Sequence, residues 1–175
     1  MPKDDARTEA YGTIDEAVSC LGLARAEIVA LEAADALPQA IRELGPTLLQ
    51  LQRDLFVAGA ELAANPDAWD RLTDGQTRVD EGMLERLEAL LAEAEATFEM
   101  PREFTVPGAD RVSAALELAR SVIRRAERRV ISLDRDGLVP GDWLVPWLNR
   151  LADLLWVYAR LVEQSGLGTT VTVRT

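Results

Sequence analysis

The stretch Ala-Arg-Ser-Val-Ile-Arg-Arg-Ala-Glu-Arg-Arg, residues 119–129, places five arginines within ten residues of an acidic chain. Its apolar residues recur at helical spacing, so we predict an α-helix here. Arg120, Arg124 and Arg128 are four residues apart and therefore line one stripe of that helix. A guanidinium is a planar, permanently charged fork that fits phosphate and carboxylate oxygens. Two interpretations stay open: a phosphate-binding helix, or a solvated face knitted by Arg–Glu pairs.

The same helical spacing of apolar residues continues on both sides of this stretch. It predicts five helices, over residues 6–34, 39–64, 79–98, 110–134 and 142–165. Gly45-Pro46 predicts a kink or an interruption inside the second helix, and Asp110 is the expected N-cap of the fourth. Long helices joined by short connections form bundles. We therefore expect an all-α five-helix bundle, and a single domain over residues 1–175.

The connections between the predicted helices carry turn residues and two short extended pieces. Residues 65–78 are polar and rich in turn formers, which predicts a surface loop. Phe104-Thr105-Val106 is extended and leads through Pro107-Gly108 into the arginine helix. The tail from Gly166 alternates valine and threonine, which is compatible with a short strand.

Composition excludes several classes of function. The formal net charge of −11 argues against a nucleic-acid-binding protein, which needs a broad basic surface. The chain has no histidine and one cysteine, Cys20, so a disulfide or a cysteine-cluster metal site within the chain is excluded. We expect Cys20 to be a packed core thiol. No segment has the length and apolarity of a membrane span or signal peptide, so we expect a soluble cytoplasmic protein with no membrane partner.

Polar residues interrupt two of the predicted apolar helix faces. Asn149, Asp153 and Arg160 share one side of the largely hydrophobic fifth helix, and Asp15 and Glu16 interrupt the first. A buried polar group without a partner costs about 1–3 kcal/mol, so each needs a specific partner. These groups either form an internal polar network or converge with the arginines on one polar ligand.

The fifth helix also carries four large aromatic residues. Trp143, Trp147, Trp156 and Tyr158 are more than one such bundle is expected to cover, so we predict that the chain self-associates.

Four blocks of sequence stand in a fixed order and resemble a known family. They are Lys3–Glu16, Leu51–Ala63, Phe104–Gly108 followed by Ala119–Arg128, and Leu148–Leu155. Arg-Arg-Ala-Glu-Arg and Leu-Asn-Arg-Leu-x-Asp at this separation are specific motifs. Over roughly residues 3–162 the chain resembles the PduO-type ATP:cob(I)alamin adenosyltransferases.

The resemblance implies a homotrimer of five-helix bundles with its active site between subunits. The implied reaction transfers the 5′-deoxyadenosyl group of ATP, bound with Mg²⁺, to the cobalt of a reduced corrinoid and releases triphosphate. Cobalt(I) is the nucleophile, so the protein supplies positioning and electrostatics, which agrees with the absence of histidine. A cobalamin-dependent acceptor enzyme is a possible partner.

The resemblance also assigns roles to individual residues. Asp15 and Arg120 match a pair that forms a salt bridge across the subunit interface, and Phe104 matches the aromatic residue that packs on the corrin and keeps water off the cobalt. Asp153 matches a residue that supports the site, and no residue is assigned as a metal ligand. The residues that match ATP-contacting positions are Lys3, Arg124, Arg125, Glu127, Arg128 and Asn149.

The sequence departs from the family pattern at several points. The family's segment of the type Thr-Arg-Thr-Gly-Asp-x-Gly-x-Thr, which wraps the triphosphate, is expected to be lacking before Lys3. Glu117 stands where the family has histidine, Val18 where it has asparagine, and Ala109 where it has the second glycine of Pro-Gly-Gly. The alternative to an active transferase is therefore a member that binds corrinoid or nucleotide without transfer, or one repurposed for another substrate.

Overall fold

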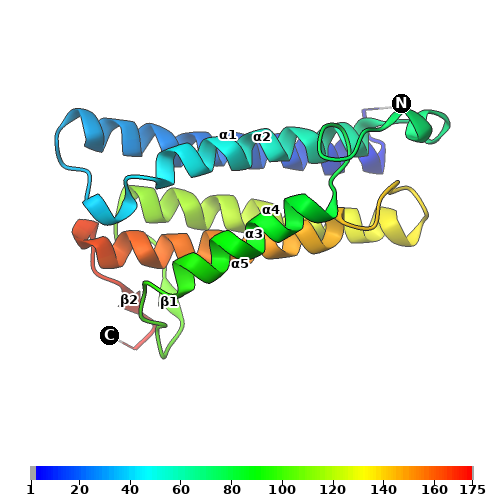
Figure 1. Ribbon diagram of the computed structural model, residues 1–175. Helices are drawn as coiled ribbons and strands as arrows, with labels where there is room; N and C mark the ends of the chain where they lie inside the picture. Colours follow the sequence, from blue (N-terminus) through cyan, green and yellow to red (C-terminus); the bar gives the residue numbers. More distant parts are fainter. Residues whose placement is uncertain (1–2, 175) are drawn as a thin grey trace.

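The computed structural model describes residues 3–174, which form an all-helical bundle with one small two-stranded sheet (Figure 1). The long helices are α1 (Ala6–Ala33), α2 (Leu44–Ala63), α3 (Glu81–Glu95), α4 (Arg111–Arg135) and α5 (Leu144–Val162). Short helical turns precede and follow α2 as η1 (Gln39–Ile41) and η2 (Pro66–Arg71), and η3 (Glu163–Leu167) is a single π-helical turn after α5. The strands are β1 (Thr105–Val106) and β2 (Val171–Thr172).

The five predicted helices are confirmed, with ends that differ by a few residues. The second predicted helix is interrupted after Ile41, and α2 starts at Leu44, so the interruption lies just before Gly45-Pro46. Asp110 caps α4 as predicted, because its side chain accepts a hydrogen bond from the Ser113 amide at 2.8 Å. The loop over 65–78 contains η2, which the polar composition did not reveal.

The helices pack in two layers with α3 lying across one of them (Figure 1). The helix α1 packs against α2 and α4, α4 against α5, and α5 against α3. The predicted extended piece and tail strand pair with each other: β1 and β2 are antiparallel, with Thr105 opposite Thr172. The chain start lies at the end of the bundle opposite this sheet (Figure 1).

The core is built from the apolar stripes that helical spacing predicted. Leucines and alanines of all five helices fill it, among them Leu21, Leu55 and Leu148 with no exposed surface. Burial at about 25 cal/mol per Å² of apolar area makes these stripes the main source of stability. Cys20 is only half-buried at the edge of this core. Burial raises the pKa of its thiol, and the negative charge of the nearby Glu16 raises it further.

The expectation that one bundle would not cover all four aromatic residues at α5 holds only for Trp143 and Trp156. A single bundle does cover most of its aromatic surface: Trp147 is fully buried, Tyr158 is buried, and Trp143 and Trp156 are half-buried. Phe98, from the segment after α3, packs edge-on against Trp156 with ring centroids 6.2 Å apart. The α3 segment therefore supplies the cover that the helical pattern of α5 alone did not suggest.

No helix among the described residues is long and apolar enough to cross a membrane. Within residues 3–174 there is also no group of three or more acidic, cysteine or histidine side chains arranged to hold a metal ion.

Candidate functional site

Some of the arginines of α4 form ion pairs within the bundle, and others do not. Arg125 and Arg129 face α1, where Arg125 pairs with Glu16 and Arg129 with Glu9 at 2.9 Å. Arg120 pairs with Glu117 at 2.7 Å within α4. The interpretation as a face of Arg–Glu pairs therefore holds for three of the five side chains.

Arg124 and Arg128 are the two remaining arginines, one helical turn apart on the outward face. Both are exposed, and within residues 3–174 neither makes an ion pair. Arg124 lines a hollow of about 220 Å³ together with Arg120, Arg150 and Asp153. Unpaired guanidinia beside an open hollow are suited to bind an anion with several oxygens.

Asn149 and Glu127 extend this polar surface from α5 to α4. The side-chain amide of Asn149 donates a hydrogen bond to Glu127 at 2.9 Å. Asp153, one turn further along α5, accepts from Arg150 at 3.1 Å. The structure thus brings five of the predicted residues to one face: Arg124, Glu127, Arg128, Asn149 and Asp153.

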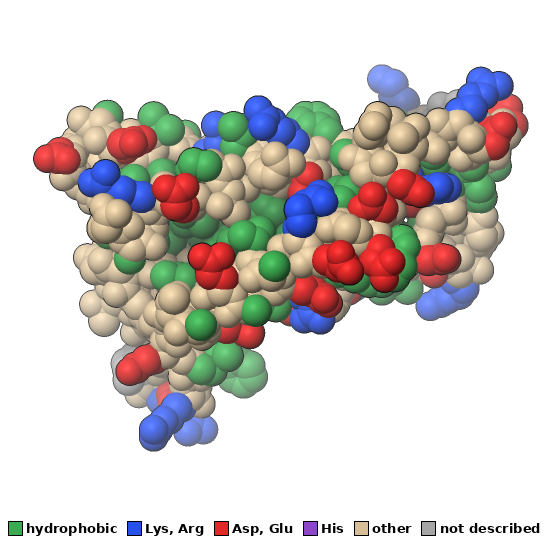
Figure 2. Space-filling model, viewed as in Figure 1, with side chains coloured by type: hydrophobic (Ala, Val, Ile, Leu, Met, Phe, Trp, Pro, Cys, Tyr) green, Lys and Arg blue, Asp and Glu red, His purple; other side chains and the backbone are tan. Residues whose placement is uncertain are grey.

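A larger hollow of about 700 Å³ adjoins the first one at the end of the bundle where β1 and β2 lie. Phe104 stands at its rim with 85% of its surface exposed. Arg120 and Trp156 line both hollows, so the two are neighbours. Figure 2 shows apolar and basic side chains gathered at this end of the molecule, where the exposed Val106 and Val173 lie beside Phe104.

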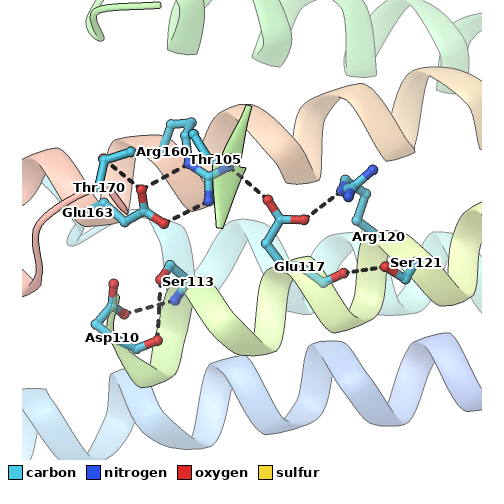
Figure 3. A network of polar contacts seen from close by, with 9 residues as sticks. All are labelled: Thr105, Asp110, Ser113, Glu117, Arg120, Ser121, Arg160, Glu163 and Thr170. Carbon is cyan, nitrogen blue, oxygen red and sulfur yellow. Dashed lines mark hydrogen bonds and ion pairs between the residues drawn. The ribbon is translucent and has the colours of Figure 1, made fainter. Parts of the chain in front are cut away.

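A buried network of charges lies behind the larger hollow (Figure 3). The Arg160 guanidinium is fully buried and donates to both oxygens of Glu163, at 3.0 and 2.7 Å. It also donates to Glu117 at 2.8 Å and to the Thr105 hydroxyl at 2.7 Å. Since Glu117 also binds Arg120, two carboxylates neutralise two guanidinia in this network.

The polar residues Asn149, Asp153 and Arg160 therefore have different surroundings, although they share one helix. Arg160 joins an internal network, whereas Asn149 is exposed and Asp153 half-buried at the open hollow. Glu117 places a negative charge beside the arginine stripe, where it is buried between Arg120 and Arg160 and pairs with both.

Three of the predicted residues, Lys3, Asp15 and Arg125, lie outside this face and line neither hollow within this chain. Lys3 is exposed ahead of α1, and α1 begins at the end of the bundle opposite the sheet (Figure 1). Asp15 is exposed on α1 and makes no ion pair within residues 3–174, while Arg120 is occupied by Glu117. Arg125 is engaged by Glu16 instead of facing either hollow. The roles assigned to these residues stay predictions.

Several residues of the site were not predicted. Trp156, Arg102 and Arg174 line the larger hollow, and Glu163, Thr105 and Thr170 complete the network behind it. One signal was available in the sequence: Glu163 stands three residues after Arg160, the spacing at which helical side chains pair.

Comparison with known proteins agrees with this architecture. Residues 1–162 match the family described as "Cobalamin adenosyltransferase". The corrinoid adenosyltransferase of Citrobacter freundii is 38% identical over 163 residues, which cover 93% of this chain and 84% of that protein. The corrinoid adenosyltransferase of Bacillus subtilis is 35% identical over 168 residues, covering 95% and 79%.

Solved structures share the fold. A variant of the PduO-type ATP:corrinoid adenosyltransferase from Lactobacillus reuteri, complexed with cobalamin and ATP, superposes with a TM-score of 0.80. The match covers 100% of this chain and 90% of that one at 24% identity. With the family match spanning nearly the whole bundle, the chain belongs to the cobalamin adenosyltransferase family.

Proposed function

We propose that this protein transfers the 5′-deoxyadenosyl group of ATP to the cobalt of a reduced corrinoid, giving an adenosylated corrinoid and triphosphate. The observation that carries the proposal is the pair of adjoining hollows that share Arg120 and Trp156. The smaller hollow is lined by three arginines together with Glu95 and Asp153, and the larger one has the exposed aromatic ring of Phe104 at its rim. A polyphosphate and a large, flat, partly apolar macrocycle need these two kinds of surface side by side.

The proposed transfer reaction needs little acid–base catalysis. The cobalt(I) electron pair attacks C5′ of ATP, the cobalt–carbon bond forms, and the C5′–oxygen bond breaks with its electrons leaving on triphosphate. The leaving group carries its charge away without a proton, so fixed cations matter more than a general acid. Arg124 and Arg128 would stabilise that charge, together with Mg²⁺ bound to the nucleotide.

Phe104 and Trp156 would bound the corrinoid. Phe104 is exposed just before β1, and Trp156 lines the same hollow. Trp156 contacts Phe98 and Arg160, whose guanidinium lies 5.4 Å from the Trp156 ring centroid. An aromatic side chain over one face of the macrocycle would exclude water from the cobalt.

We also propose that a trimer completes the site. The hollow beside Arg124 has a volume of about 220 Å³, below the roughly 300–1,000 Å³ typical of ligand pockets. Lys3 precedes α1 and Asp15 lies within it, and neither lines a hollow, so a neighbouring subunit would have to bring them to the site. A cytoplasmic location, where ATP and reduced cobalt coexist, and delivery of product to an acceptor enzyme belong to the same proposal.

Replacement of Arg124 tests the nucleotide part of this proposal. Arg124→Ala removes an unpaired cation from the smaller hollow, so ATP should bind about 10–100-fold more weakly by calorimetry, the loss expected for one charge-assisted hydrogen bond. The control is Arg135→Ala, an exposed arginine at the far end of the same helix. Equal ATP affinity in Arg124→Ala and wild type would contradict the assignment.

A further inference from the structure

The fully buried guanidinium of Arg160 touches neither hollow but joins the parts that shape both. From α5 it reaches Thr105 on β1, Glu117 on α4 and Glu163 at the start of η3 (Figure 3). Glu163 in turn accepts from the Thr170 hydroxyl at 2.7 Å, just before β2. Four separate segments of the chain therefore meet at one side chain.

The first consequence concerns Phe104. It is the residue before Thr105, and its exposed ring receives little support from packing. Two hydrogen bonds hold the backbone around Phe104. The Phe104 carbonyl accepts from the Val173 amide at 3.0 Å, and the neighbouring Thr105 hydroxyl accepts from Arg160 at 2.7 Å. A strand of two residues cannot hold its own position, so the hydrogen bond from Arg160 fixes where Phe104 stands over the hollow.

The second consequence concerns Arg120. One oxygen of Glu117 accepts from Arg160 at 2.8 Å, and the other accepts from Arg120 at 2.7 Å. A carboxylate held on both oxygens cannot rotate, so Arg160 also fixes the orientation of Arg120. Arg120 lines both hollows.

The geometry points to Arg160 as a positioning residue that sets the placement of Phe104 through Thr105 and of Arg120 through Glu117. This inference rests on the proposed function, and it adds that one buried network aligns the corrinoid side and the nucleotide side of the site. Misplacement of a reacting group by about 1 Å is enough to slow a reaction by roughly 100-fold, so loss of this alignment should slow the transfer.

Thr105→Val is the sharpest variant, because valine keeps the size and β-branching of threonine and removes only the hydroxyl that accepts from Arg160. The matched control is Thr47→Val on α2, which also loses one threonine hydroxyl hydrogen bond, to the Glu43 carbonyl at 2.8 Å. Thr47 lies outside both hollows.

Hydrogen exchange on the ligand-free protein tests the positioning directly. In Thr105→Val the amides of residues 104–106 and 171–173 should exchange about tenfold faster than in wild type, as expected for loss of one hydrogen bond to a charged group. Thr47→Val should leave them unchanged. Unchanged exchange in Thr105→Val, or equal acceleration in the control, would overturn the inference.

Kinetics and spectroscopy separate positioning from a merely structural role. For Thr105→Val we expect kcat to fall about tenfold while the KM for ATP stays within about twofold. The electron paramagnetic resonance spectrum of bound cob(II)alamin should show more cobalt with an axial ligand, because a displaced Phe104 admits water. A proportional rise in the KM for ATP, or a wild-type spectrum, would contradict the role of Arg160.

Failure of the proposed function would be recognised separately. If wild-type protein neither binds nor adenosylates a corrinoid, the function is wrong, and the exchange experiment alone decides whether Arg160 holds β1.

Discussion

Glu61 is a fully buried carboxylate near the C-terminal end of α2, outside the candidate site. Burial raises its pKa to about 7, although the Val79 amide donates to it at 2.8 Å and Arg78 lies nearby. Between about pH 4.5 and 7 the folded chain keeps this proton and the unfolded chain releases it. The free energy of unfolding should therefore fall as pH rises through this window.

Glu61→Gln should remove this pH dependence, because glutamine stays neutral. Urea unfolding at pH 5 and at pH 7.5 measures this dependence. Between these pH values the free energy of unfolding of the wild type should fall by up to about 3 kcal/mol more than that of the variant. Identical losses in the two proteins would show that Glu61 ionises at the same pH whether folded or unfolded.

Glu117 carries a second residue-scale prediction. Among the described residues, Glu117→Gln leaves Glu163 as the one carboxylate that pairs with Arg160, and it leaves Arg120 without its partner (Figure 3). Removing one partner of a buried ion pair typically costs about 3–5 kcal/mol, so the free energy of unfolding should drop by that order. Chemical denaturation measures the change, and a loss below about 1 kcal/mol would indicate that the network is open to water.

At the residue scale, the sequence indicated which polar side chains need partners but not which partners they find. Arg160 was singled out on an apolar helix, and Glu163 is predictable from its spacing. Thr105 and Glu117 lie 55 and 43 residues away in sequence, so only the tertiary fold brings them to Arg160.

At the scale of elements, the tail strand β2 depends on a close approach at Gly168. A Cβ added there would lie 2.8 Å from the Ala109 carbonyl oxygen and 2.9 Å from its carbon, both backbone atoms that cannot move easily. Gly168→Ala should therefore push the tail away from β1 and lower the free energy of unfolding by about 1–3 kcal/mol.

Thermal unfolding and hydrogen exchange at residues 171–173 measure that effect. Gly12→Ala is the matched glycine replacement, since Gly12 lies within α1 and a Cβ there would meet nothing within 4 Å. It should not lower stability, because alanine favours helix over glycine by up to about 1 kcal/mol. Equal melting temperatures for Gly168→Ala and wild type would show that the tail does not need this contact.

The helices themselves were predictable because each buries a continuous apolar stripe, as in α2 and α5. The short elements were harder. A two-residue strand such as β1 is defined by its partner, and β2 follows it by 65 residues, so alternation in the tail could indicate a strand without indicating its pairing.

At the scale of the whole molecule, the proposed trimer places Asp15 of one subunit beside Arg120 of the next. If so, Asp15→Ala and Arg120→Ala should each lose transfer activity, and a mixture of the two chains assembled together should regain it. In mixed trimers about a quarter of the interfaces carry both wild-type residues. Light scattering should give three times the chain mass.

No recovered activity in mixed trimers would contradict a site shared between subunits. A monomer by light scattering at micromolar concentration would contradict the trimer itself.

The most direct measurement supplies ATP and chemically reduced cob(I)alamin to the wild-type protein and follows the products. Formation of a light-sensitive adenosylated corrinoid should be accompanied by one triphosphate for each cobalt–carbon bond. Arg124→Ala should slow both by the same factor. Corrinoid and ATP that bind side by side without forming this product, or ATP cleaved to another phosphate product, would contradict the proposed transfer.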